Sequence, residues 1–211
     1  MNNQHQTLPP RVEKGTTGFV FATTGENYTI LARRAARTLR QVMPDCNVDL
    51  FTDQKITDGI FNRIHHLSHD WFRPKMQAIR ESRFERSVVL DADILVTADI
   101  SEVFQILDQC DIAGTQGVAR GVGMLKTKSS VPRCFPPINS GFSAVKASNK
   151  LYNFSQVWES ALKEGNENKD QPALRDLLYT NKSLRFLDLG MEYNLIKLRY
   201  LNVWEKANGA P

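Results

Sequence analysis

The sequence predicts a single α/β domain with a mostly parallel sheet flanked by helices. Two observations point to this class. Short apolar runs that suit buried strands alternate with stretches whose apolar residues recur at helical spacing. The chain also opens with a strand, a helix and a second strand, which is the order of a parallel unit. In such sheets ligands bind at the carboxyl ends of the strands, so the residues directly after each strand are the first candidates for a site.

The opening unit is the clearest part of the pattern. An apolar strand is expected at Gly18–Ala22, a helix at Tyr28–Met43 and a second strand at Val48–Asp53. Pro44 directly follows the helix and stops it. Four arginines fall on the face opposite to the apolar residues of the helix: Arg33, Arg34, Arg37 and Arg40. Such a face can bind a polyanion or an acidic membrane surface, but we favour a solvated face whose long side chains cover the edge of the sheet.

The rest of the chain continues the alternation. Further strands are expected at Phe61–Leu67, Ser87–Leu90, Asp111–Gly114 and Leu184–Leu187, and a turn followed by a strand at Asn139–Val145. Further helices are expected at Pro74–Arg83, Glu102–Leu107, Leu151–Lys163 and Gln171–Tyr179. Ser101 is expected to cap the second of these helices. Residues 120–137 are rich in glycine, lysine, serine and proline, and we expect a mobile loop there.

Composition places the chain among globular proteins without choosing a partner. Of its 211 residues, 41% are hydrophobic and 24% are charged, and the net charge is +4. That mild excess fits an anionic small molecule, a membrane surface or a nucleic acid. No nucleic-acid-binding signature accompanies it, so we predict no nucleic-acid partner. Peripheral membrane association and the oligomeric state stay open.

The N-terminal segment and the cysteines bear on the expected cellular location. No apolar run is long enough to span a membrane, and the polar start of the chain does not resemble a secretory signal. Three widely spaced cysteines predict no disulfide framework, and a cytoplasmic location is the default expectation. We expect residues 1–16 to be a disordered lead-in, residues 17–205 the domain, and residues 206–211 a tail.

The strongest candidate site is a pair of carboxylates. Asp91 and Asp93 follow an apolar strand, and in extended backbone residues two apart point to the same face. Both can then bind one hard cation such as Mg²⁺ or Mn²⁺, which neutralises a leaving diphosphate. The plain alternative is a capped strand end. A rival chemistry is that of haloacid-dehalogenase-type phosphatases, which carry D-x-D-x-T/V, but Leu95 departs from that pattern.

Several segments, taken in order, resemble the glycogenin-like and galactosyltransferase-like GT-A glycosyltransferases, which are retaining enzymes. The similarity runs from about Phe19 to Leu195. It is carried by FATTGENYTILARRAARTLRQ, FRPKMQAIRESRFERSVVLDADILVTADISEVF, INSGFSAVKAS, KDQPALRDLLY and MEYNL. Each segment alone is weak, but five in the family's order are specific. The resemblance implies a GT-A-type Rossmann-like sheet and transfer of a sugar from a nucleoside-diphosphate donor, expected to be a UDP-sugar, with Mn²⁺ or Mg²⁺.

The resemblance also implies roles at the nucleotide end of the donor. Thr23, Thr24 and Tyr28 would surround the nucleoside, with Tyr28 stacked on the base. The alternative for Tyr28 is an aromatic side chain packed on the core. Lys75 would reach the phosphates or the donor sugar, and its alternative is an exposed helix lysine. Asp91 would contact the ribose and the metal, and Asp93 would chelate the metal.

At the sugar end the resemblance implies five more residues. Asn139 and Ser140 would bind hydroxyl groups of the donor sugar, and Gly141 would allow the backbone to come close. The alternative is a turn, because Asn-Ser-Gly has turn chemistry. Asp170 and Gln171 would lie beside the reacting anomeric carbon. The alternative for Asp170 is a helix N-cap, and both roles are compatible.

The sequence departs from the family at one point. The family's later histidine, in an H-x-x-G-x-x-K-P-W-like segment, has no counterpart, and His65, His66 and His69 do not match it. The third metal ligand is therefore unassigned. Water or the diphosphate fills the position, the chain is truncated, or metal binding is weak. A non-catalytic nucleotide-sugar binder is thus the main alternative to an active transferase, and the acceptor is not predicted.

Overall fold

A single sheet organises the protein, whose computed structural model describes residues 12–117, 131–165 and 169–196. The strands are β1 (Glu13–Thr23), β2 (Val48–Thr52), β3 (Arg63–His66), β4 (Phe84–Leu90), β5 (Ile112–Gln116), β6 (Ile138–Lys146) and β7 (Phe186–Leu189). Their order across the sheet is β3-β2-β1-β4-β6-β5-β7. β6 runs antiparallel to both of its neighbours, and the other neighbouring pairs are parallel. The predicted mostly parallel α/β fold is confirmed.

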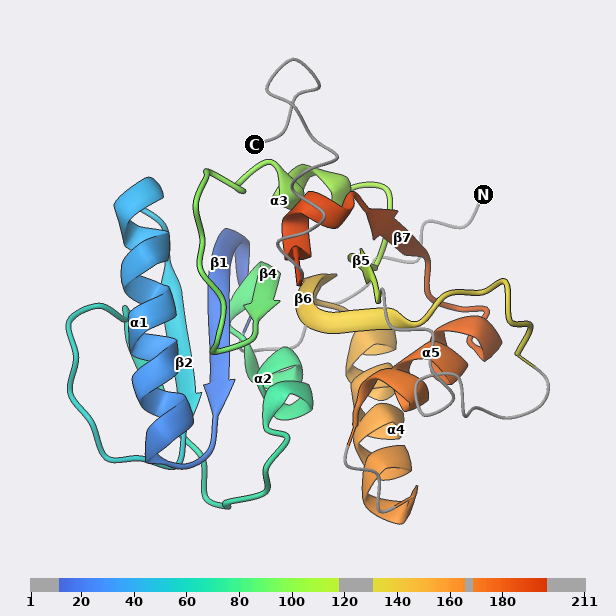
Figure 1. The fold of residues 1–211 in the computed structure, drawn as a ribbon, viewed down its shortest axis with the longest axis horizontal. Coiled ribbons are helices and arrows are strands. Elements are labelled where there is room, and N and C mark those ends of the chain that lie inside the picture. Colours follow the sequence, from blue (N-terminus) through green and yellow to red (C-terminus); the bar gives the residue numbers. More distant parts are fainter. Residues whose placement is uncertain (1–11, 118–130, 166–168, 197–211) are drawn as a thin grey trace.

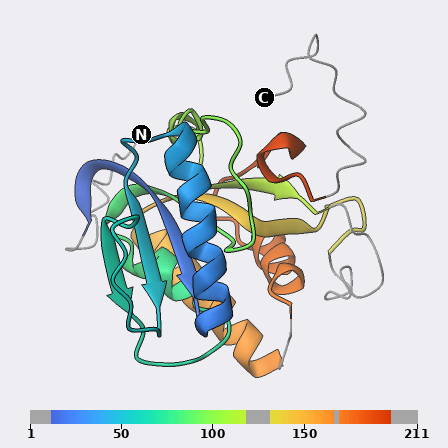
Figure 2. The ribbon, with the colours of Figure 1, turned by 60° about the vertical axis from the view of Figure 1, so that its left-hand side comes forward.

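Helices cover both faces of this sheet. They are α1 (Glu26–Val42), α2 (Lys75–Glu81), α3 (Val103–Ile106), α4 (Asn149–Gly165), α5 (Gln171–Thr180) and the 3₁₀ helix η1 (Met191–Asn194). Helix α1 lies along one face next to β1 and β2, and α2 and α4 lie on the other (Figure 1). The turned view in Figure 2 shows α1 running in front of the strands with α4 behind them. None of the helices in the described ranges is long and apolar enough to cross a bilayer.

The hydrophobic core has two parts, one on each face of the sheet, because strand side chains alternate between the two faces. On β1, Phe19 and Phe21 pack with the α1 side, whereas Val20 belongs to the cluster that includes α2 and α4. Three alanines on α1 are completely buried, so the helix comes close to the sheet. The buried, nearly continuous apolar strands hold the carboxyl ends of β1 and β4 at fixed positions, and this is where the candidate site lies.

The arginine face of α1 holds a neighbouring loop. Arg33 and Arg37 both donate to Asp58, with N–O distances of 2.6 and 3.3 Å. Arg40 donates to the side-chain oxygen of Asn62 at 2.7 Å and to three backbone carbonyl oxygens. These contacts tie α1 to the segment between β2 and β3. The structure therefore gives three of the four arginines a structural role.

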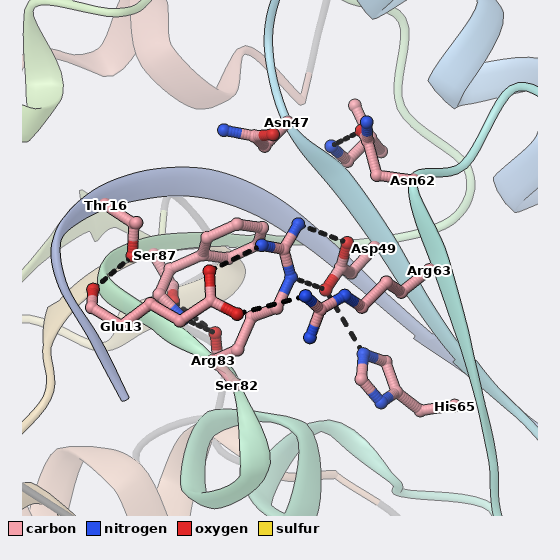
Figure 3. Close-up of polar contacts among 12 residues, drawn as sticks. Glu13, Thr16, Asn47, Asp49, Asn62, Arg63, His65, Ser82, Arg83 and Ser87 are labelled. Carbon is pink, nitrogen blue, oxygen red and sulfur yellow. Dashed lines mark hydrogen bonds and ion pairs between the residues drawn. The ribbon is translucent and has the colours of Figure 1, made fainter. Parts of the chain in front are cut away.

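A second polar network lies at the β2–β3 edge of the sheet. Arg83, just before β4, donates to Asp49 of β2 at 2.9 Å and to Glu13 of β1 at 3.0 Å. His65 of β3 lies 3.1 Å from the same Asp49 carboxylate, whose side chain is 1% exposed. Figure 3 shows the guanidinium group between the two carboxylates. Burial opposes ionisation of Asp49, but bonds from His65 and Arg83 outweigh it and lower its pKa.

Most predicted elements are present, with shifted ends. β1 begins at Glu13, so residues 13–16 of the expected lead-in are strand. β7 begins two residues later than expected. The cap predicted at Ser101 is wrong, because α3 begins at Val103 and has no side-chain cap bond. Much of the expected loop at 120–137 lies outside the described residues, as do most of the predicted lead-in and the tail.

The turn weighed for Asn139–Gly141 is also wrong, because these residues lie within β6. The strand is irregular there. Gly114 of β5 pairs with Ser143, but the next residue, Thr115, pairs with Asn139. Residues 140–142 are thus left without partners on the β5 side, as in a bulge. The turn-type residues Asn139–Gly141 therefore form a bulge within a strand. The sequence pattern alone does not distinguish such a bulge from a turn.

Candidate functional site

The candidate site lies where parallel strands end. β1 and β4 are neighbours, with Phe21 opposite Leu90, so Thr23 and Asp91 leave the sheet at the same edge. β2 ends at this edge too, because Thr52 pairs with Thr23. Ligands of open α/β sheets bind at such an edge. The predicted residues on β1 and β4 are therefore placed together by the strand register.

Lys75 is the centre of the site. It is the first residue of α2, and its side chain is only 10% exposed. Its ammonium group lies 2.6 Å from Asp91, 2.6 Å from the carbonyl oxygen of Ser140 and 3.8 Å from Asp170. The alternative of an exposed helix lysine is wrong. Three segments that are far apart in the sequence are joined at one buried cation.

The bulge in β6 makes the carbonyl contact to Lys75 available. A regular ladder would direct each carbonyl of β6 to a neighbouring strand. Between Asn139 and Ser143 that ladder with β5 is interrupted, and the Ser140 oxygen accepts from Lys75 instead. On the other side the strand stays paired, since the amide of Asp91 donates to Gly141 at 2.9 Å. The irregular pairing thus supplies a ligand for the lysine while keeping Asp91 in register.

Asp170 faces the site and does not cap its helix. It occupies the N-cap position of α5, but no side-chain capping bond forms. Its carboxylate accepts from the hydroxyl of Ser140 at 2.8 Å, and its carbonyl accepts from the indole of Trp158 at 3.1 Å. The side chain is 7% exposed. A buried carboxylate that makes no cap but bonds to Ser140 and lies beside Lys75 belongs to the site.

Opposite charges keep Lys75 and Asp170 ionised. Burial opposes the charge of Lys75, but Asp91 and Asp170 outweigh it and raise the pKa of the ammonium group. Burial likewise opposes the charge of Asp170, while the cations of Lys75 and Arg73 and the Ser140 hydroxyl lower its pKa. At neutral pH the ammonium group of Lys75 and the carboxylate of Asp170 are therefore both charged.

Amide side chains form the next part of the site. The side-chain oxygen of Asn139 accepts from the amide of Gln171 at 3.2 Å and from the backbone of Gly141 at 3.0 Å. Gly141 leaves space for these side chains. A Cβ there would lie 2.9 Å from Asp91 Oδ2 and 3.0 Å from Asn194 Nδ2. Asn139 therefore contacts both Gln171 and Gly141, three of the residues that the sequence predicts for the sugar end.

The residues predicted around the nucleoside lie at the end of β1 and the start of α1. Thr23 is 3% exposed, and its hydroxyl is 3.0 Å from that of Thr29, which continues to Thr52 at 2.9 Å. Thr24 is half-buried. Tyr28 is 60% exposed, so the alternative of core packing is wrong. Thr23 supports the strand ends, whereas Thr24 and Tyr28 are open to a ligand.

The two aspartates of the carboxylate pair differ in setting. β4 ends at Leu90, and residues 92–93 form a turn, so strand alternation does not place the two side chains as expected. Asp91 Oδ1 binds Lys75, and its Oδ2 makes no bond to another described residue. Asp93 is exposed and has no polar contact within the described part of the chain. No group of three or more metal-ligating side chains occurs among the described residues.

Three nearby residues were not predicted as site residues. Asn194 on η1 faces Gly141, Arg73 influences the charge of Asp170, and Asp53 accepts from the backbone of Gly25 at 2.9 Å. Asp53 follows a strand, so the rule about strand ends could have found it. Asn194 lies in the family-like MEYNL segment, but nothing local in that segment indicates its contact.

A separate cavity of about 340 Å³ lies toward the opposite ends of β1 and β2. It is lined by residues such as Thr17, Cys46, Asn47 and Phe104. None of the predicted site residues lines it. We place the chemistry at the strand ends instead, because that is where the buried charges converge.

Comparisons with known proteins bear on the family and the fold. The sequence profile of the nucleotide-diphospho-sugar transferase family matches residues 26–207. No curated protein sequence matches the chain. Among solved structures, galactosyltransferase LgtC with donor and acceptor sugar analogues is 12% identical, with a TM-score of 0.60 over 90% of this chain and 79% of LgtC. An active-site mutant of LgtC gives a TM-score of 0.64 at 12% identity, over 89% of this chain and 78% of the mutant. Glycosyltransferase GlyE of Streptococcus pneumoniae TIGR4 is 17% identical, with a TM-score of 0.62 over 89% of this chain and 48% of GlyE.

Proposed function

Since this chain belongs to the nucleotide-diphospho-sugar transferase family and is a glycosyltransferase of the GT-A fold, we propose that it transfers a sugar from a UDP-sugar to an acceptor with retention at the anomeric carbon. The observation that carries the proposal is the buried Lys75 between Asp91 and Asp170 at the carboxyl ends of the strands. In this proposal the cation faces the diphosphate of the bound donor. The family assignment leaves the phosphatase alternative without support.

Lys75 would bind the donor and balance its charge. A diphosphate entering beside Asp91 meets a carboxylate that already shares the Lys75 ammonium group. The ammonium group is a compact point charge, held by a carbonyl and two carboxylates, and it needs little reorganisation to face a phosphate oxygen. This preorganisation would lower the cost of developing negative charge on the leaving UDP.

The residues of the site fit a hard divalent cation. Asp91 Oδ2 has no partner among the described residues, and the carboxylate of Asp93 is exposed two residues later. Oxygen donors of this kind suit Mn²⁺ or Mg²⁺, with the diphosphate and water completing the ligands. Asp91 and Asp93 would hold the ion. When bound, it would neutralise the diphosphate as a Lewis acid.

The opposite end of the site would orient the sugar. Asn139 and Gln171 already bond to each other, and Ser140 is fixed by Asp170. Their remaining polar atoms would bind hydroxyl groups of the sugar. The ionised, buried Asp170 would stabilise positive charge at the anomeric carbon as the bond to UDP breaks. At the far end, the exposed ring of Tyr28 would stack on the uracil, next to Thr24.

The test is donor hydrolysis without acceptor, followed as UDP release from a panel of UDP-sugars. In the Asp170→Asn variant we expect release from the preferred donor to fall about 100-fold or more, because a charge that stabilises the transition state is lost. UDP affinity should stay within a few-fold of the wild type. Asp108→Asn is the matched control, because Asp108 is exposed and its carboxylate pairs with Arg86, away from the site. NMR of the sugar product would establish retention or inversion.

The same assay distinguishes an active transferase from a non-catalytic nucleotide-sugar binder. A nucleotide-sugar binder would bind UDP in a metal-dependent way but would release no UDP from any donor in the panel. Equal release by the wild type and Asp170→Asn would instead remove Asp170 from the reaction.

A further inference from the structure

An unpaired amide group lies beside the carboxylate pair. Asn194, the last residue of η1, has a side-chain nitrogen that is closed off from solvent and has no hydrogen-bond partner among the described residues. Leaving a buried donor without an acceptor is unfavourable, and such groups are rare in folded proteins. The position of this amide therefore calls for an acceptor that the surrounding described residues do not yet provide.

The fold holds Asn194 in place through its neighbour. The ring of Tyr193 packs against Phe142 of β6 with centroids 5.9 Å apart, and its hydroxyl donates to Glu102. Burial and the carboxylate of Glu102 raise the pKa of Tyr193 to about 12, so this hydroxyl stays protonated at neutral pH. η1 also contacts both β5 and β6. The amide is thus directed at the site by a fixed segment.

A neighbouring acceptor with spare capacity belongs to Asp91. Over the bare Cα of Gly141, the point that a Cβ would occupy lies 3.0 Å from Asn194 Nδ2 and 2.9 Å from Asp91 Oδ2. Oδ1 of Asp91 is held by Lys75, whereas Oδ2 has no partner within the described chain. The oxygen of Asn139 also lies near, but it already accepts two bonds. An unpaired donor and an unpaired acceptor thus border the same small space.

We propose that Asn194 is a positioning residue for Asp91: when the metal and the donor are bound, its amide donates to Oδ2 and, together with Lys75 on Oδ1, fixes the plane of the carboxylate that holds the metal. The inference rests on the proposed function. One anchor leaves a carboxylate free to turn about its Cβ–Cγ bond, and two anchors on different oxygens remove that freedom. Residues that bond to a metal-ligating carboxylate commonly change metal affinity by about 10- to 100-fold when substituted.

The experiment is a calorimetric titration of UDP at a series of Mn²⁺ concentrations. The wild type is compared with Asn194→Ala and with Asn194→Leu, which keeps the branched shape of the side chain but cannot donate. In both variants we expect the Mn²⁺ concentration for half-maximal UDP binding to rise about 10- to 100-fold. At saturating Mn²⁺ the UDP affinity should return to within a few-fold of the wild type. Asn153→Leu is the matched control, because Asn153 is exposed on α4 and its side chain has no polar contact with another described residue.

Thermal melting without ligand separates positioning from a structural role. Asn194→Leu removes an unpaired buried donor, so its melting temperature should equal or exceed that of the wild type. An unchanged Mn²⁺ requirement in a folded Asn194→Leu variant would overturn the inference. So would a weaker UDP affinity that saturating Mn²⁺ does not restore. If the wild type itself binds no UDP at any Mn²⁺ concentration, the proposed function fails, and this inference falls with it.

Discussion

Substitution of Gly141 by alanine tests the geometry of the site with one added methyl group. The new Cβ would lie 2.9 Å from Asp91 Oδ2, 3.0 Å from Asn194 Nδ2 and 3.2 Å from Asn139 Oδ1. Ordinary carbon contacts begin near 3.4 Å, so Asp91 has to move by about half an ångström. All three atoms are the ends of side chains, so the backbone can stay where it is. The strain therefore falls on the site rather than on the sheet.

We expect this displacement to lower kcat/KM for UDP release by about tenfold or more, since a shift of roughly 1 Å in a reacting group can cost about 100-fold. A tenfold loss corresponds to about 1.4 kcal/mol of transition-state stabilisation. The melting temperature should change by only a few degrees. Gly59→Ala is the control, because a Cβ at Gly59 meets nothing within 4 Å. Wild-type kcat/KM in Gly141→Ala would refute the close approach of Gly141 to Asp91.

Three further predictions concern stability. Lys75→Met leaves Asp170 buried without its closest cation, and we expect it to lower the free energy of unfolding by roughly 3 kcal/mol in urea denaturation. The control is Lys163→Met, because Lys163 is exposed. Equal losses of stability in the two variants would contradict the central role of Lys75. Asp49→Asn leaves the Arg83 network without its buried carboxylate, and a loss of about 3 kcal/mol is expected in the same assay; a loss below about 1 kcal/mol would make the network a surface feature. Because the folded-state pKa of Asp49 is lowered, its contribution is present above the unfolded pKa of about 3.9 and is lost as pH falls through the folded value. Denaturation at pH 7 and pH 3 should therefore show a smaller pH dependence in Asp49→Asn than in the wild type, and equal pH dependence would contradict this assignment.

The sequence predicts the sheet well because its strands are buried and its helices are amphipathic. The run around Phe19–Phe21 and the period of α1 are local patterns that survive packing unchanged. The order of the strands is not local, and β6, which runs antiparallel between β4 and β5, follows from no feature of its own sequence. The bulge that turns the Ser140 carbonyl toward Lys75 likewise depends on the partner strand.

Residue types in the site were predictable, but their contacts were not. Lys75 and the Ser140 carbonyl are 65 positions apart, and Ser140 and Asp170 are 30 apart. Local rules favoured an exposed lysine and a helix-capping aspartate, and tertiary contacts overrode both. Asn194 was not predicted for the same reason, because its role depends on its contact with Gly141, which is distant in the sequence.

Calorimetric titration of UDP with and without Mn²⁺ would show whether the strand-end carboxylates bind a metal–UDP complex. Asp93 is the residue to substitute, because it is exposed and contacts no described polar group, so Asp93→Ala should fold as the wild type does. We predict that Mn²⁺ strengthens UDP binding to the wild type and that Asp93→Ala loses this dependence. Equal UDP affinity in both proteins, with and without Mn²⁺, would contradict the account.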